Sequence, residues 1–128
     1  MTGLDPDNWD ALRALGHQMV DDMFNRLSTL RERPGWQPMP AALRDQLRTG
    51  LPHDPTPPQE LYARFRELVE PYSTGNIHPG FMGWVHGGGT AMGMLAELLA
   101  GGLNANCGGR DHAPIEVERE VIRWAAEM

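Results

Sequence analysis

Side chains that could bind a metal ion occur in two glycine-containing loops of this sequence. Imidazole, thiolate and carboxylate groups are the usual ligands of zinc. The loops carry five of them, namely His78, His86, Cys107, Asp111 and His112. Their spacing fits no closed zinc motif, because the chain has no HxxxH, CxxC or HExxH run. We expect no metal site here: the ordinary alternative is histidines that hydrogen-bond within their loops and a buried Cys107 thiol.

Trp84 is the most distinctive residue of the first loop, because it lies between Gly83 and Gly87. Sites often lie on loops that a rigid scaffold holds. A large aromatic side chain on a glycine-rich loop is typical of a ligand pocket, and packing in a core explains it equally well. The segment 72–89 has no regular period, so we expect an irregular loop with one short extended piece at 81–85.

The composition excludes several kinds of chemistry and partner. The chain has 128 residues, 41% of them hydrophobic, which suits one domain or a piece of a larger one. A net charge of −6 argues against nucleic acid or an anionic membrane as the main partner. All basic residues are arginines, so no Schiff-base or P-loop lysine is available. The single cysteine excludes an internal disulfide and suits a reducing cytoplasm.

Five helices are expected to position these loops. Apolar residues at steps of three and four predict a long helix over 7–33, capped by Asp5 or Asp7. A proline-rich strap, residues 34–58, follows it and excludes a long regular element. The other predicted helices are 41–48, 58–70 with Pro71 as its stop, 90–103 with Thr90 as its cap, and 114–128.

The last predicted helix has no glycine, proline or capping residue before Met128. Natural helices usually end on such a signal. We therefore expect the chain to be the front part of a longer protein. No stretch approaches the length of a membrane-spanning helix, so we expect no membrane partner.

Several features of the chain occur together in one order. An opening helix ends in the strap, PYSTGNIHPGF precedes a glycine and an aromatic residue, and MLAELLAG leads through a loop to E-x-E-x-x-V-x-x-W. This combined pattern covers nearly the whole chain. It resembles the N-terminal part of the pyridoxal-phosphate-dependent group II amino-acid decarboxylases, which include aromatic-amino-acid and glutamate decarboxylases.

The resemblance implies a fold and an assembly. It implies an all-α N-terminal segment of a fold-type-I enzyme that forms a homodimer and is several times longer than this chain. Residues 1–71 would be wrapping helices with the proline-rich strap. Residues 72–128 would line the pocket and lead into the large domain that binds pyridoxal 5′-phosphate, which is absent from this sequence.

The resemblance also implies roles for individual residues. Phe81, Trp84, Val85, His86 and Gly87 would line the pocket for an amino-acid substrate. Asn106 and Gly108 would reach toward the site of the neighbouring subunit. The Schiff-base lysine and the other catalytic groups lie farther along in the family, so no catalytic residue is expected here and this chain alone should be inactive.

The sequence leaves the substrate and the type of protein open. Aromatic-amino-acid decarboxylases often carry an aromatic-Pro-Thr run where this chain has Val85, His86 and Gly87, so a preference for aromatic substrates does not follow. The main reading is a decarboxylase segment that supplies dimer contacts and pocket lining. The alternatives are a stand-alone helical dimerisation or interaction module without activity, and a small metal-binding helical protein.

Overall fold

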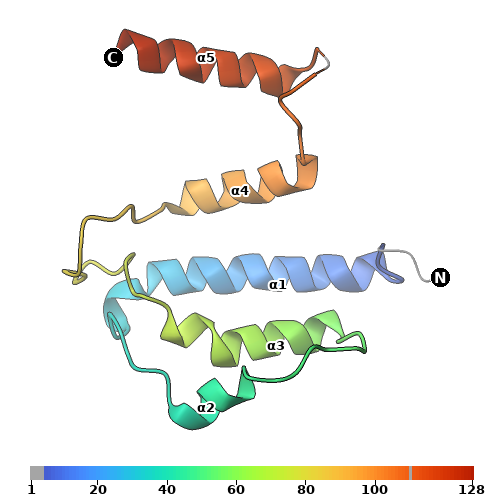
Figure 1. The fold of residues 1–128 in the computed structure, drawn as a ribbon, viewed down its shortest axis with the longest axis vertical. Coiled ribbons are helices and arrows are strands. Elements are labelled where there is room, and N and C mark those ends of the chain that lie inside the picture. The colour runs from blue at the N-terminus through green and yellow to red at the C-terminus, as the bar shows by residue number, and fades with distance from the viewer. Residues whose placement is uncertain (1–4, 110) are drawn as a thin grey trace. The chain divides into compact units, whose positions relative to one another are not determined.

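The computed structural model describes residues 5–109 and 111–128, and within them every regular element is helical. The five α-helices are α1 (Trp9–Ser28), α2 (Ala41–Gln46), α3 (Pro58–Leu68), α4 (Ala91–Leu103) and α5 (Ala113–Glu127), with two short 3₁₀ helices, η1 (Leu30–Glu32) and η2 (Glu70–Tyr72) (Figure 1). The expected all-α class is therefore confirmed. The chain forms two compact units, the first ending at Gly89 and the second beginning at Thr90. The expected division of roles at residues 71 and 72 stays a prediction.

The ends of the helices differ from the expected ones at a few residues. Asn8, rather than Asp5 or Asp7, caps α1, because its side chain accepts a 2.9 Å hydrogen bond from the Ala11 amide. Pro71 does not simply stop α3. It occupies the first turn of η2, where the missing amide hydrogen of proline costs nothing. The short extended piece expected at 81–85 does not form, and these residues are bends and irregular chain.

In the first unit, α1 and α3 lie side by side and run in the same direction (Figure 1). Two ion pairs with the same spacing in the chain are consistent with this parallel direction. Arg66 donates a 2.9 Å hydrogen bond to Asp22, and Arg26 donates a 3.1 Å hydrogen bond to Glu70, so both contacts join residues 44 apart in the chain. Because parallel helices cannot be joined by a tight turn, residues 29–57 carry the chain back along the pair.

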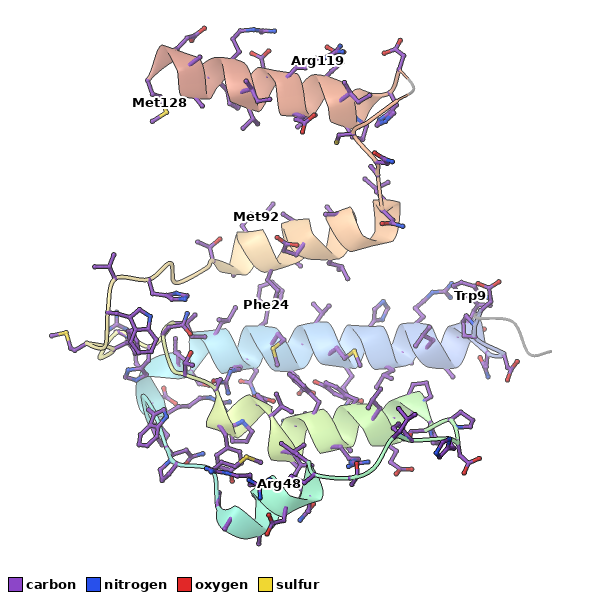
Figure 2. All side chains as sticks on the ribbon, viewed as in Figure 1. Trp9, Phe24, Arg48, Met92, Arg119 and Met128 are labelled. Carbon is purple, nitrogen blue, oxygen red and sulfur yellow. The ribbon has the colours of Figure 1, made fainter. Side chains whose placement is uncertain are left out.

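The apolar contact between these helices is narrow. Leu15 of α1 and Tyr62 and Leu68 of α3 are buried. Phe24 projects from the side of α1 that faces away from α3 (Figure 2) and is partly exposed. Next to this contact lies an open groove. Apolar side chains line it, namely Leu12, Met19, Met23, Pro58, Leu61 and Phe65. The long apolar stripe of α1 is therefore only partly covered within the first unit.

Glu70 is the centre of the polar contacts in the first unit. Its side chain is only 9% exposed, and three guanidinium groups surround it. Arg26 lies 3.1 Å from one carboxylate oxygen and Arg33 3.9 Å from the same oxygen, while Arg66 lies 3.7 Å from the other. A carboxylate this buried is costly unless it is paired. The three arginines therefore hold the end of α1 and the turn after α3 together.

In the second unit, α4 and α5 have clear ends but bury little. Thr90 caps α4 as expected, since its hydroxyl accepts a 2.9 Å hydrogen bond from the Gly93 amide. Asn104 ends α4 in the left-handed conformation, with φ of 44°, which asparagine tolerates better than most residues. Ile115 is the one buried residue of this unit among residues 90–109 and 111–128. Most apolar side chains of both helices thus remain exposed in the unit taken alone.

Candidate functional site

The loop of residues 74–87 is positioned by a close crossing of two backbone segments. A Cβ atom on Gly75 would lie 1.7 Å from the Gly35 carbonyl oxygen, and Gly75 has a φ of +71°. Only glycine meets both conditions, because a side chain would clash and left-handed backbone disfavours other residues. The crossing therefore anchors the start of the loop on the segment that follows η1.

His78 organises the turn that follows this crossing. Its amide donates a 2.8 Å hydrogen bond to the Gly75 carbonyl, and its own carbonyl accepts one of 2.9 Å from the Phe81 amide. Its Nδ1 accepts a 2.9 Å bond from the Gly80 amide, so Nε2 carries the hydrogen of the neutral ring. That Nε2 is buried without a hydrogen-bond partner among the described residues. His78 therefore forms hydrogen bonds within its loop, which is what the sequence analysis gave as the alternative to a metal ligand.

Three of the five expected pocket residues form one aromatic cluster. The Phe81 and Trp84 rings lie 5.0 Å apart between centroids and meet edge to face at 87°. The Trp84 and His86 rings lie 6.5 Å apart at 65°. Trp84 is 61% exposed, so in this chain it is not a core residue. The cluster presents aromatic surface and one imidazole to its surroundings.

Gly83 allows the Phe81 ring to fold back over the loop. A Cβ atom at Gly83 would lie 2.7 Å from the tip of that ring. Neither Gly83 nor Gly87 has a positive φ, whereas Gly89 does, with φ of +72°. The glycine at 83 therefore provides space for an aromatic ring rather than an unusual backbone conformation.

Asn76 and Thr74 complete the cluster, and sequence reasoning missed both. The Asn76 side chain lies 3.2 Å from Nδ1 of His86 and 3.3 Å from the Gly87 carbonyl oxygen. The Thr74 hydroxyl donates a 2.7 Å hydrogen bond to Oδ1 of Asn76. The signal was the short Thr-Gly-Asn run, since asparagine in a glycine turn often forms local hydrogen bonds. These contacts tie the two ends of the loop together across ten residues.

The remaining expected site residues lie apart from these contacts. Val85 is fully exposed. Asn106 and Gly108 belong to the second unit, where Asn106 accepts a 2.8 Å hydrogen bond from the Gly108 amide and its carbonyl lies 2.9 Å from Nε2 of His112. These bonds shape the loop between α4 and α5. A role of Asn106 and Gly108 at a neighbouring subunit stays a prediction.

The described residues do not bring the candidate metal ligands together, and they place the Cys107 thiol at the surface. Within 5–109 and 111–128, no three side chains of histidine, cysteine, aspartate or glutamate come together as a metal site would require. The expectation that Cys107 is buried is wrong: its thiol is exposed, in the loop that follows Asn104. The part of the chain that the structure describes also has no helix that is both long and apolar enough to cross a bilayer. The aromatic cluster is the candidate site that the described residues form, and aromatic rings beside one imidazole can bind a ligand.

Comparison with known proteins gives one informative similarity. No family model and no solved structure matches the chain. The chain is similar to the aromatic-L-amino-acid decarboxylase of Bacillus atrophaeus, with 27% identity over 127 residues that cover 93% of this chain and 25% of the relative. The chain therefore spans about a quarter of the length of the curated relative that it matches.

Proposed function

We propose that this chain is the N-terminal part of a pyridoxal-phosphate-dependent amino-acid decarboxylase of fold type I, in which it supplies dimer contacts and lines the substrate pocket. The observation that carries the proposal is the similarity of 93% of the chain to a quarter of a decarboxylase. An all-helical segment with exposed apolar faces suits such a part. The enzyme would be a cytoplasmic homodimer that acts on an amino acid.

The cofactor would be held by the rest of the enzyme. This chain has no lysine, so it holds no side chain that could form the covalent imine with pyridoxal phosphate. The cofactor would supply the electron sink for the carbanion left when carbon dioxide departs. The contribution of this chain would be to orient the substrate and exclude water, which the Phe81, Trp84 and His86 cluster could do.

The exposed faces of the second unit support the proposed dimer contacts. Large apolar side chains that remain open in a soluble protein usually mark an interface. Leu99 is 65% exposed on α4, and Trp124 is also exposed on α5. The same faces would suit a stand-alone dimerisation module without activity, which is the second candidate function.

One experiment separates the two candidates. The longer reading frame that contains this segment is expressed with pyridoxal phosphate, and release of carbon dioxide is measured for each common amino acid. The decarboxylase proposal expects release that disappears when residues 1–128 are deleted. It also expects that the 128-residue chain alone gives no borohydride-reducible bond to the cofactor once its terminal amine is blocked. Absence of release from every amino acid, with dimerisation intact, would favour the module.

A further inference from the structure

A small cavity lies where the end of α1, the start of the proline-rich strap and the chain after η2 meet. Its volume is about 90 Å³, and its wall comes from residues within 26–37 and 71–78. Since one water molecule needs about 10–15 Å³, the cavity has room for a ligand of about four to six non-hydrogen atoms. The wall ends at His78, before the aromatic cluster begins at Phe81.

Several hydrogen-bond donors in this wall have no acceptor among residues 5–109 and 111–128. Arg26 donates a 3.1 Å hydrogen bond to the Ser73 hydroxyl. Because that hydroxyl accepts the bond, it keeps its own hydrogen to donate. Arg33 donates through Nε to the Thr29 hydroxyl, and its terminal nitrogens form no hydrogen bond to the described residues. The wall can therefore offer N–H and O–H groups to a ligand.

His78 adds a buried donor to the same wall. Its Nδ1 accepts a hydrogen bond from the Gly80 amide, so Nε2 carries the hydrogen of the neutral ring. This Nε2 is buried, and the described residues give it no partner. Because a buried donor without a partner destabilises a fold, an acceptor bound in the cavity would be stabilising.

The charges around the cavity favour a ligand with one negative charge. Among the described residues, no aspartate or glutamate lines it. Beside it, three guanidinium groups share two carboxylates, and these residues are Arg26, Arg33, Arg66, Asp22 and Glu70. One positive charge is therefore in excess. Arg33 is the least well paired of the three, because 3.9 Å separates it from the Glu70 carboxylate, which is beyond hydrogen-bond distance.

The apolar part of the wall limits the kind of anion. Leu30, Trp36 and Ile77 contribute to it. A phosphate or sulfate ion has oxygens on every side and would place some of them against these side chains. A short carboxylate has two oxygens at one end, which match a guanidinium group, and hydrocarbon at the other. The wall therefore suits a short carboxylate better than an inorganic oxyanion.

We infer that this cavity binds a short-chain carboxylate such as acetate or propionate, whose oxygens accept hydrogen bonds from Arg33, Ser73 and Nε2 of His78. Gly35 and Gly75, whose backbones cross here, line the same cavity. The ligand would therefore stabilise the anchor of the loop of residues 74–87. The inference goes beyond the proposed function and does not depend on it.

The test is a titration of the 128-residue chain with sodium acetate, at neutral pH and at an ionic strength held constant with sodium chloride. The indole N–H signal of Trp36 should shift and saturate, with a dissociation constant of about 1–10 mM. Acetate at about ten times that constant should raise the melting temperature by about 3–6 °C. The signal of the Nε2 hydrogen of His78 should also move as acetate is added.

Variants assign the binding to this cavity. Arg33→Gln should raise the dissociation constant for acetate at least about tenfold, and Ser73→Ala should raise it by a smaller factor. Arg31→Gln is the matched control, because it removes the same charge from an exposed residue of η1 outside the wall, and it should bind acetate as the unmodified chain does. Circular dichroism checks that each variant keeps its helices. Ser73→Ala, which removes one hydroxyl, carries the test if Arg33→Gln does not fold.

Each contrary outcome overturns a stated part of the inference. Shifts that do not saturate, or that chloride produces equally, would show a general effect of salt and overturn the site. Equal affinities of Arg33→Gln and Arg31→Gln would do the same. Tighter binding of phosphate than of acetate would overturn the choice of a carboxylate. The decarboxylase activity of a longer protein enters none of these measurements, so the inference and the proposed function fail separately.

Discussion

The Tyr62 hydroxyl donates a hydrogen bond over 2.8 Å to Oδ2 of Asp22, and this bond joins the middle of α3 to α1. The same carboxylate oxygen accepts a second hydrogen bond, over 2.9 Å, from Arg66. Burial, followed by the bond to Asp22, raises the pKa of Tyr62 to about 12. The parallel helix pair therefore contains a tyrosine that holds its hydrogen more tightly in the folded protein than in the unfolded chain.

This raised pKa predicts a loss of stability at high pH. An unfolded tyrosine titrates near pH 10, so between about 10 and 12 the unfolded chain releases a hydrogen that the folded protein retains. The stabilising contribution of Tyr62 is complete below about pH 10 and disappears as the pH rises toward about 12. Urea titrations at increasing pH should show a steeper fall in the free energy of unfolding for the unmodified chain than for Tyr62→Phe. Tyr72→Phe, which removes the other tyrosine hydroxyl, should retain the steep fall.

Removal of Arg26 should destabilise the first unit far more than removal of an exposed arginine. Arg26→Ala removes a hydrogen bond that the Glu70 carboxylate accepts, and that side chain is 9% exposed. The substitution should lower the free energy of unfolding by about 2 kcal/mol. Arg13→Ala breaks an exposed pair with Asp10 and should cost no more than about 0.5 kcal/mol. Adding Glu70→Gln to Arg26→Ala should recover part of the loss, since it removes a buried charge that has lost its nearest arginine and keeps only the longer contacts to Arg33 and Arg66. Equal losses for the two single variants would contradict this account of Glu70.

Substitution of Gly75 should disturb the loop that carries the aromatic cluster. Gly75→Ala places a Cβ atom 1.7 Å from the Gly35 carbonyl oxygen at a φ of +71°, and should lower the unfolding free energy by about 2 kcal/mol or more. Gly87→Ala is the matched control, because its Cβ would meet nothing within 4 Å and its φ is not positive. Thermal melts of both variants test the prediction. A Gly75→Ala protein as stable as the control would show that the crossing is not held as described.

A charge on the open face of α4 should weaken self-association of the chain. Leu99 is 65% exposed in the chain alone, and Leu99→Asp would place an unpaired charge in the proposed interface. We expect the dissociation constant from sedimentation to rise at least several-fold, with helix content unchanged. His53→Asp adds the same charge in the exposed strap and should leave association as it was. A monomeric unmodified chain throughout the micromolar range would refute the proposed dimer contacts.

Truncation of Trp84 should affect turnover rather than stability. Substitution of a buried tryptophan by alanine lowers the free energy of unfolding by about 3–5 kcal/mol. Trp84 is 61% exposed, so we expect no such loss. In the full-length enzyme, Trp84→Ala should keep a nearly normal melting temperature and lose about tenfold in kcat/KM. Trp36→Ala removes a similarly exposed tryptophan outside the aromatic cluster and should change kcat/KM little. A variant that melts early while its folded fraction turns over normally would assign Trp84 to a core formed in the full enzyme.

The sequence predicted the helices well because their signals are local. Apolar spacing, together with capping and proline signals, predicted five helices that overlap the five observed ones, and Thr90 was correctly expected as a cap. The errors at Asn8 and Pro71 are of one or a few residues, because several neighbouring residues could each cap or break the helix. The aromatic cluster was partly predicted for the same reason, since Phe81, Trp84 and His86 are close in sequence.

The sequence could not predict contacts between residues far apart in the chain. Nothing in the local pattern distinguishes Glu70, which three arginines surround, from the exposed glutamates of α5. The clash that requires glycine at position 75 depends on the carbonyl of Gly35, which lies forty residues earlier. The exposed thiol of Cys107 was missed because an isolated cysteine carries no pattern that reports its burial.

The parallel pairing of α1 with α3 also determines when the apolar side of α1 can be covered during synthesis. Tyr62 follows its partner Asp22 by 40 residues. A ribosome that adds about 5–20 residues per second needs several seconds to make that stretch. During this time α1 is made but the helix it packs against is not, so its apolar side has no covering surface from its own chain. The apolar side of α1 is therefore covered late although α1 is translated first. Nascent α1 is thus the stretch of the first unit that most needs protection from aggregation.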